Sequence, residues 1–275
     1  SVSVICSDKT GTLTQNRMTL GKVYSAGKIQ DVTEDSPDDV AALLRLGALC
    51  CDGTVEIRDG KQIHRGDPTE TAIVAAMMKV LKTDKQTLDD TYPRMCEIPF
   101  DSERKLMTTV CVIDGKPYAI VKGGSDIVID RSRNIHKEEV LKANTQMAND
   151  ALRVLGIAIK PLDEVPSNPT MEQLEYDLTF VGLVGMIDPP REEAKVAIEE
   201  CKRAGIRTVM ITGDHVATAS AIARQLGIMQ ESDRAVTGTE LSEMTDEQLF
   251  EQIEHISVYA RVSPEDKIRI VQTWQ

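Results

Sequence analysis

The order of the predicted strands and helices constrains the fold of this chain most. From about Thr179 onward, short apolar runs alternate with amphipathic stretches. The pattern predicts strands over 179–187, 206–211 and 257–260, and helices over 190–203, 215–226, 241–253 and 264–274. Strands that alternate with helices are typical of βαβ units in a parallel sheet. One more buried strand is expected over 1–7, so this sheet draws its strands from both ends of the sequence.

The middle of the chain follows a different pattern. Strands are expected over 23–29, 54–57, 96–98, 105–113 and 118–121, and helices over 38–50, 70–81 and 136–150. Asp114-Gly115 favours a hairpin turn between two of these strands, and the Pro-, Asn- and Ser-rich stretch 161–170 favours a linker. We therefore expect an α+β domain with antiparallel strands, residues 21–175, inserted into an α/β domain made of residues 1–20 and 176–275.

Composition argues against several classes of protein. The 275 residues carry a net charge of −12, whereas nucleic-acid-binding proteins present a basic surface. No apolar run approaches the ~18 residues of a membrane span, and the N-terminus lacks the pattern of a signal peptide. The six cysteines show no CxxC spacing, and no histidine pattern completes a zinc site. We expect a soluble, monomeric chain with reduced thiols.

An acidic residue at the end of the first strand is the first candidate for chemistry. Asp8 is followed by Lys9, Thr10 and Gly11 in the run DKTGTLT. At the carboxyl edge of a parallel sheet, a strand-end side chain faces the crevice where ligands bind. Gly11 allows a sharp turn that directs backbone N–H groups at an anion. A carboxylate there can attack a phosphoryl group and become an aspartyl phosphate; an Asp that caps the next segment is the structural alternative.

The longer run ICSDKTGTLTQNRMT resembles the P-type ion-pumping ATPases, in particular their calcium- and sodium-pump branch. The resemblance covers essentially the whole chain. It implies a haloacid-dehalogenase-like, Rossmann-type phosphorylation domain split by an inserted nucleotide-binding domain. It also implies ATP and Mg²⁺, with Asp8 as the phosphorylated residue, and Asp8 and the backbone carbonyl of Thr10 as metal ligands. Phosphatases of this fold usually carry a catalytic Asp at the position of Thr10, so a long-lived phosphoenzyme is expected.

Two further motifs of the α/β domain match the family's catalytic residues. The family's TGD motif matches Thr212, Gly213 and Asp214, and it places the Thr hydroxyl on the phosphoryl group and the Asp near Mg²⁺. The RVxPxxK motif matches Arg261 through Lys267, and its Lys contacts the transferred phosphate as a point charge. The structural alternatives are an N-cap for Asp214 and a solvated helix position for Lys267.

A fourth motif, DPPR, runs from Asp188 to Arg191 and matches the nucleotide and hinge region of the family. A helix cap with proline at the first helical position explains Asp188 and Pro189, but it does not explain the full motif. A capping box is also expected at the start of the last helix, formed by Ser263 and Asp266.

The inserted domain is expected to hold ATP. The family places a Glu near the adenine amino group, an aromatic ring on the base and a Lys in the pocket, and these match Glu70, Phe100 and Lys105. Its KGA motif matches Lys122 and Gly123, and its LR motif matches Arg153, whose guanidinium can fork onto phosphate oxygens.

Each of these matches has a structural alternative. Asp67 and Glu70 fit a capping box around Pro68, Phe100 fits a core position, and Arg153 fits a strand edge. One match is missing: Ser102 stands where the calcium pumps carry an Arg, so the nucleotide interaction of that Arg is either absent or made by Arg104.

The sequence ends shortly after Lys267, before the family's GDGVNDAP segment, and it holds neither membrane helices nor an actuator domain. We therefore expect the part of a larger membrane-bound cation pump that lies at the cytoplasmic face, with calcium as the favoured ion and little turnover by this part alone. The alternatives are a soluble phosphatase of the same fold, which Thr10 disfavours, and a nucleotide-binding module without catalysis.

Overall fold

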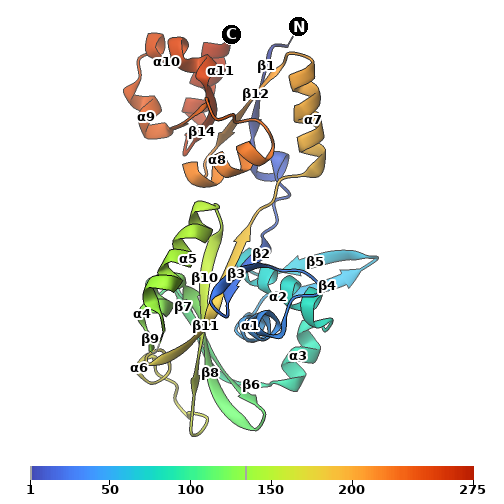
Figure 1. Ribbon diagram of the computed structural model, residues 1–275, viewed down its shortest axis with the longest axis vertical. Coiled ribbons are helices and arrows are strands. Elements are labelled where there is room, and N and C mark those ends of the chain that lie inside the picture. Colours follow the sequence, from blue (N-terminus) through green and yellow to red (C-terminus); the bar gives the residue numbers. More distant parts are fainter. Residues whose placement is uncertain (1, 134) are drawn as a thin grey trace. The chain divides into compact units, whose positions relative to one another are not determined.

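The computed structural model describes residues 2–133 and 135–275. The chain divides into two compact units, which we describe separately (Figure 1). Unit 1 comprises Ser1–Arg17 and Asp188–Gln275, and unit 2 comprises Met18–Ile187. Ser1, which belongs to the strand expected over 1–7, lies outside the described residues. The division at 187/188 falls later than the expected 175/176, because the strand before it belongs to unit 2.

Unit 1 is built on a parallel sheet of four strands in the order β1-β12-β14-β13. Its elements are β1 (Val4–Asp8), the turn η1 (Lys9–Leu13), α7 (Glu192–Arg203), β12 (Arg207–Thr212), α8 (Val216–Gln225), β13 (Arg234–Thr237), α9 (Gly238–Glu243), α10 (Asp246–Gln252), η2 (Ile253–His255), β14 (Ile256–Ala260) and α11 (Pro264–Trp274). The alternation of strands and helices expected for this part of the chain is confirmed. Buried aliphatic residues and Tyr259 form its core.

Two details of unit 1 differ from the sequence-based expectation. The helix expected over 241–253 is two helices, α9 and α10, because Thr245 begins a new helix with a capping box to Gln248. Strand β13 was not expected, since its four residues are too short to show a periodicity.

Unit 2 contains a mostly antiparallel sheet in the order β3-β2-β11-β10-β8-β7-β6, with β9 paired to β11 and the hairpin β4–β5 apart from it. Its elements are β2 (Thr19–Ser25), β3 (Lys28–Asp31), α1 (Asp38–Leu49), β4 (Thr54–Arg58), β5 (Lys61–Arg65), α2 (Pro68–Leu81), α3 (Lys85–Thr91), β6 (Arg94–Asp101), β7 (Leu106–Ile113), β8 (Lys116–Gly124), α4 (Ser125–Asp130), β9 (Ser132–Arg133), α5 (Lys137–Asn149), β10 (Arg153–Pro161), α6 (Met171–Leu174) and β11 (Leu178–Ile187). The expected antiparallel α+β pattern is confirmed.

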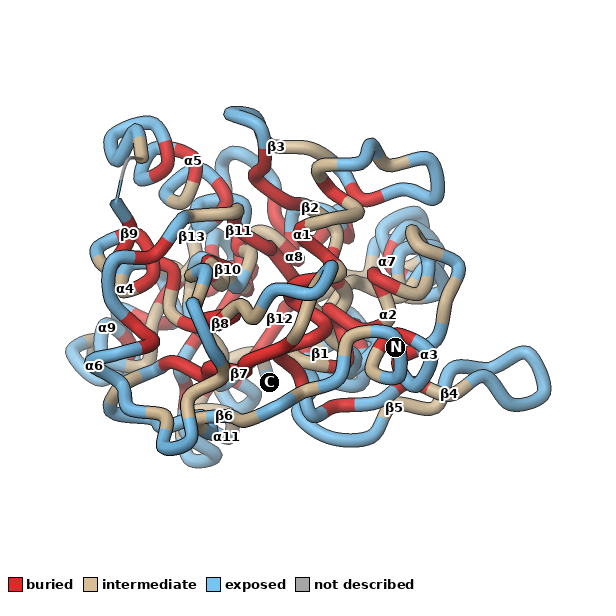
Figure 2. Tube along the Cα trace, turned by 90° about the horizontal axis from the view of Figure 1, so that it is seen from below, coloured by how far each residue is buried: buried red, intermediate tan, exposed pale blue. Residues whose placement is uncertain are grey.

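Both faces of this sheet are covered by helices. Successive strand residues point to opposite faces: Met107 and Ile120 pack in the core under α1 and α2, whereas Leu106 and Val121 pack in another cluster together with Val128 of α4. In Figure 1, α1 and α2 lie on one side of the sheet and α4 and α5 on the other. Buried stretches follow the strands, while the β4–β5 hairpin is largely exposed (Figure 2).

Two predicted strands of unit 2 need correction. The strand expected over 23–29 is the hairpin β2–β3, which turns at Ala26 and Gly27, both with positive φ. The strand expected over 179–187 is β11, and it pairs antiparallel with β10 and β2 instead of joining the parallel sheet. A strand covered on both faces is apolar throughout, so its sequence does not show which sheet it joins.

Candidate functional site

The catalytic candidates of unit 1 meet at the carboxyl ends of neighbouring strands. Asp8 is the last residue of β1 and lies opposite Ile211 of β12. Thr212, Gly213 and Asp214 follow directly, and Arg261 follows β14, which pairs with β12 on its other side. Because these strands are parallel, residues distant in sequence reach the same edge of the sheet.

Two lysine–aspartate pairs form at this edge. The Lys267 ammonium lies 2.6 Å from the Asp8 carboxylate, and the Lys9 ammonium lies 2.6 Å from the Asp214 carboxylate. Lys9 is almost fully buried, whereas about half of the Asp8 side chain is exposed. Lys267 lies near the start of α11, which begins with the expected capping box of Ser263 and Asp266. The carboxylate that is open to solvent therefore has a cation beside it.

The turn after β12 is held by a side-chain hydroxyl and by a backbone amide that follows β14. The buried Thr212 hydroxyl oxygen accepts a hydrogen bond from the Asp214 N–H at 3.1 Å, and the Arg261 N–H donates to the Asp214 carbonyl at 3.1 Å. A Cβ at Gly213 would meet no atom within 4 Å, so the turn borders open space. The N-cap expected at Asp214 is wrong: His215 caps α8, which leaves the Asp214 carboxylate to Lys9.

The DPPR motif braces the turn that follows Asp8. The Asp188 carboxylate accepts from the Thr14 hydroxyl at 2.6 Å and from the Arg17 N–H at 3.1 Å. The Arg191 guanidinium donates to the carbonyls of Thr14 and Gly11 at 2.8 and 3.2 Å. The cap expected at Asp188 is wrong, because α7 begins later and its N-cap is Arg191. Arg191 thus holds the backbone of Gly11 and Thr14, and Asp188 holds the Thr14 side chain and the Arg17 backbone.

The expected Mg²⁺ ligands fit a metal that arrives with its substrate. Within residues 2–133 and 135–275, no group of three or more His, Cys, Asp or Glu side chains is placed to hold a metal ion. The half-exposed Asp8 carboxylate and the backbone of the exposed Thr10 are adjacent on the turn. Mg²⁺ commonly binds one or two carboxylates and completes its shell with waters and substrate phosphates, so this donor set suits it.

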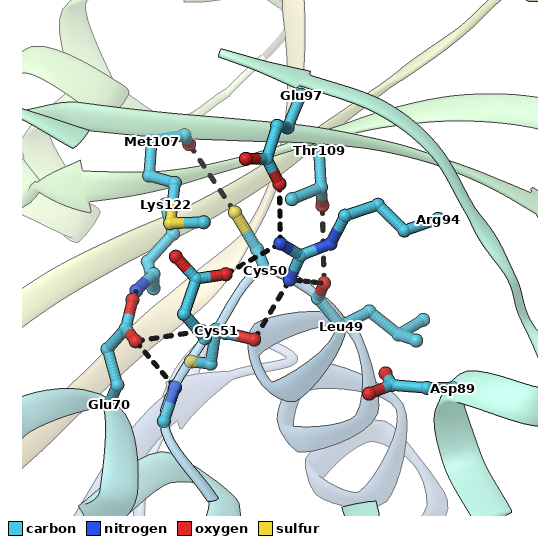
Figure 3. A network of polar contacts seen from close by, with 12 residues as sticks. Leu49, Cys50, Cys51, Glu70, Asp89, Arg94, Glu97, Met107, Thr109 and Lys122 are labelled. Atoms are coloured by element: carbon cyan, nitrogen blue, oxygen red, sulfur yellow. Dashed lines mark hydrogen bonds and ion pairs between the residues drawn. The ribbon is translucent and has the colours of Figure 1, made fainter. Parts of the chain in front are cut away.

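In unit 2, an ion pair joins Glu70 at the start of α2 to Lys122 on β8 (Figure 3). Their side chains are 2.6 Å apart, and 14% and 7% exposed. The second carboxylate oxygen of Glu70 accepts from the N–H groups of Asp52 and Gly53 at 2.8 and 2.9 Å. The expected capping box is half right: Asp67 caps α2, but Glu70 turns to Lys122 and these two amides.

The surroundings of Lys122 keep it charged. Burial disfavours the ammonium, but the ion pair with the Glu70 carboxylate outweighs that cost and keeps the pKa of Lys122 raised. Burial raises the pKa of the Cys51 thiol to about 12, so this thiol is neutral near pH 7. The Cys50 thiol lies 3.4 Å from the backbone carbonyls of Met107 and Ile120 (Figure 3).

Three other candidates, Phe100, Lys105 and Gly123, lie on or next to the neighbouring strands β6, β7 and β8 of the same sheet. Phe100 is 61% exposed, so the alternative of a core position is wrong. Lys105 is exposed and has a positive φ of 56°. Its carbonyl accepts from the Gly124 N–H at 3.0 Å and would lie 2.1 Å from a Cβ at Gly123, so only glycine fits there. This close approach holds Lys105 next to the strand that carries Lys122.

Arg104 has a structural partner. It forms an ion pair with Glu175, which is fully buried and also accepts from Thr108 at 2.7 Å and from Arg131 at 3.0 Å. Arg104 is therefore committed to this buried network and does not stand in for the family arginine that Ser102 replaces. Arg153 begins β10, where it is exposed and lies opposite Met186 of β11.

Sequence reasoning missed the residues that hold Glu70 and Arg104 in place: Asp52, Gly53, Arg94 and Glu175. An Asp-Gly dipeptide after a helix indicates only a turn, and a Glu in a polar stretch indicates only a surface position.

None of the helices in the described part of the chain combines the length and the apolarity needed to cross a membrane.

Comparison with known proteins identifies relatives. The family model of cytoplasmic domain N of P-type ATPases matches residues 39–193. The chain is 44% identical over 288 residues to calcium-transporting ATPase 1 of Lactococcus lactis, with 100% of this chain and 32% of the relative covered. It is 40% identical to the calcium-transporting ATPase of Bacillus subtilis, with 99% and 34% covered, and 43% identical to a calcium-transporting ATPase of Listeria monocytogenes, with 100% and 32% covered. The chain thus spans about a third of the length of these relatives.

Proposed function

Because the chain belongs to the P-type ATPases, as its motifs predict, we propose that it binds ATP and forms an aspartyl phosphate in a cation pump of the calcium-transporting kind. The observation that carries the proposal is the pairing of the half-exposed Asp8 with Lys267 at a sheet edge that also holds Thr212 and Asp214. The similarity to calcium-transporting ATPases supports the choice of cation.

In the proposed reaction, unit 2 holds the base of ATP. Phe100 stacks on the adenine ring, and aromatic stacking contributes about 1–3 kcal/mol per base. Glu70 accepts a hydrogen bond from the adenine amino group, while Lys122 and Lys105 border the pocket and Gly123 keeps the two strands close. Arg153 presents its guanidinium to phosphate oxygens.

Unit 1, which we propose to be the haloacid-dehalogenase-like phosphorylation domain, carries out the transfer. A carboxylate oxygen of Asp8 attacks the γ-phosphorus of ATP, the bond to the bridging oxygen breaks, and ADP leaves. Lys267 moves from the carboxylate to the transferring phosphoryl group, whose charge it offsets together with the Thr212 hydroxyl. Lys9 holds Asp214 beside the reacting group, and Asp188 and Arg191 keep the Gly11 turn open for phosphate.

Mg²⁺, held by Asp8 and the Thr10 carbonyl, would neutralise charge on the phosphate oxygens when bound. Thr10 offers no carboxylate to activate water, so the phosphoenzyme outlives the transfer step and its energy remains available for transport. Transmembrane and actuator domains of the same parent protein would use it, with this part lying at the cytoplasmic face of the membrane.

Two measurements test the proposal. Calorimetry on the 275-residue chain should show ATP binding. In the full-length protein, γ-labelled ATP should give an acid-stable, hydroxylamine-labile phosphoenzyme that Asp8→Asn abolishes. A phosphatase would release the label quickly, and a module without catalysis would bind ATP without incorporating label; either result would contradict the proposal.

A further inference from the structure

Arg94 carries a network of contacts that the proposed reaction does not use. It begins β6, and its guanidinium reaches the C-terminal end of α1 (Figure 3). One nitrogen, Nη2, donates to the backbone carbonyls of Leu49 and Cys51 at 3.3 and 2.9 Å. The other, Nη1, donates to the carboxylates of Asp52 and Glu97, both at 2.6 Å. Its side chain is only 26% exposed, and a cation at this end of a helix is favoured by the helix dipole.

These contacts fix the backbone that orients Glu70. Asp52 and Gly53, which follow the carbonyls held by Arg94, donate their N–H groups to one oxygen of Glu70, while Lys122 binds the other. Gly53 is closely packed as well, since a Cβ there would lie 3.0–3.1 Å from side-chain atoms of Thr71 and Glu70. The direction of the Glu70 carboxylate therefore depends on where this segment is held.

We propose that Arg94 is a positioning residue of the nucleotide site: through the Asp52 and Gly53 amides it aims the Glu70 carboxylate at the base and so sets the preference for adenine. This inference rests on the proposed function. The planar guanidinium of Arg94 donates to two backbone carbonyls and two carboxylates at once. The flexible ammonium of a lysine does not reproduce this arrangement of donors. The residue acts on the base only through Glu70.

The choice between adenine and hypoxanthine reports on this role. The 6-amino group of adenine donates a hydrogen bond, and an ionised carboxylate only accepts, so a correctly aimed Glu70 pairs with ATP. Inosine triphosphate (ITP), whose base is hypoxanthine, has a carbonyl oxygen at the same position. A carboxylate cannot form a hydrogen bond with this oxygen because both groups only accept, and a site built for one hydrogen-bonding pattern rejects the other. A loss of general stability would weaken both nucleotides alike, whereas a misdirected Glu70 lowers their ratio.

The experiment measures the dissociation constants of ATP and ITP by calorimetry on the 275-residue chain. The variants are Arg94→Met, Glu70→Gln and the double substitution, with Arg133→Met as the matched control. Arg133 is an arginine of unit 2 whose 69%-exposed side chain pairs with Asp177. We expect the wild type to prefer ATP by about tenfold, the scale of one hydrogen bond to a charged group. Arg94→Met should remove most of this preference, the double variant should add nothing to Glu70→Gln, and Arg133→Met should match the wild type.

Each other outcome is decisive. If the wild type binds neither nucleotide, the proposed function fails and this inference fails with it. If it binds both equally well, or if Arg94→Met binds ATP with the full preference, the inference is wrong while nucleotide binding stands. Should circular dichroism show that Arg94→Met does not fold, Arg94→Lys replaces it, because the charge is kept and the fork is removed. An intermediate preference in that variant supports the inference, and an unchanged one overturns it.

Discussion

Lys267 and Asp8 lie 259 positions apart in the sequence, and their side chains are 2.6 Å apart in unit 1. Each is partly exposed, 38% for Lys267 and 48% for Asp8, so the pair is open to a ligand from solvent. A surface ion pair of this kind adds little to stability, about 0–1 kcal/mol. The pair therefore contributes little to the stability of unit 1, which agrees with the role in phosphoryl transfer that we propose for it.

Asp8→Asn should separate binding from phosphoryl transfer. In the full-length protein, an amide cannot act as the nucleophile, so label from γ-labelled ATP should not be incorporated. ATP affinity should be unchanged or higher, because the charge of Lys267 is no longer neutralised by Asp8. Asp130→Asn, an 85%-exposed partner of Lys137, is the control and should incorporate label normally. Label at the wild-type level in Asp8→Asn would remove Asp8 from the reaction.

Lys267→Met should slow phosphorylation without weakening ATP binding. The ammonium offsets charge that develops during transfer, and removing one such donor typically costs about 10²–10³ in rate. Single-turnover labelling of the full-length protein at saturating ATP measures this rate. Calorimetry should give the wild-type dissociation constant, since the base is held by unit 2. A rate within a factor of about three of the wild type, well short of that range, would assign Lys267 to structure alone.

The carboxyl edge of the parallel sheet in unit 1 can be predicted from the sequence. Alternating strands and helices imply a parallel sheet, and its carboxyl edge collects whatever follows each strand, so Asp8 and Thr212 are expected to be close. Local rules also predict the capping box at Ser263. These rules fail for Asp214. They predict a helix cap, but its carboxylate pairs with Lys9, which lies near the other end of the chain.

In unit 2, the local sequence does not predict which sheet β11 joins or which groups bind Glu70. Strand β11 is apolar because helices cover both faces of its sheet, and this hides the sheet to which it belongs. Glu70 follows the capping pattern, but Lys122 and two backbone amides bind it instead. Such partners depend on tertiary contacts between segments 17 to 52 residues apart, which no local pattern encodes.

Phe100→Ala should weaken ATP binding and leave the fold intact. Loss of one stacked aromatic costs about 1–3 kcal/mol, or roughly 5- to 150-fold in the dissociation constant. Because the ring is 61% exposed, the urea midpoint should hardly change. Phe250→Ala is the matched control, since this phenylalanine is 68% exposed in unit 1. Equal ATP affinity for Phe100→Ala and wild type would remove the ring from the site.

Gly123→Ala should damage both the packing of unit 2 and its nucleotide affinity. The new methyl group would lie 2.1 Å from the Lys105 carbonyl and 2.9 Å from the Leu106 Cα, so β7 and β8 must separate. Such overpacking typically costs about 1–3 kcal/mol. Urea unfolding and calorimetry measure the two effects. Gly21→Ala, where a Cβ would meet nothing within 4 Å, should change neither; similar behaviour of the two variants would contradict the close approach.

Glu175→Gln should destabilise unit 2 and spare unit 1. The carboxylate is fully buried between Arg104 and Arg131, and removing one partner of a buried ion pair typically costs about 3–5 kcal/mol, because charge is left unpaired. Each unit has its own probe. Cys51 is buried in unit 2 and burial raises the pKa of its thiol to about 12, so alkylation of Cys51 near pH 8, followed by peptide mapping, reports the opening of unit 2. Trp274, the only tryptophan, reports unit 1.

In urea, alkylation of the Glu175→Gln variant should begin at lower denaturant than in the wild type, while the Trp274 fluorescence transition stays in place. Asp177→Asn is the matched control, because this carboxylate lies two residues away but is 49% exposed. An exposed pair contributes at most about 1 kcal/mol, so both transitions should remain close to those of the wild type. If Glu175→Gln also leaves the Cys51 alkylation transition in place, the buried pairs do not stabilise unit 2, and the turn between β6 and β7 that carries Arg104 is held by its other contacts.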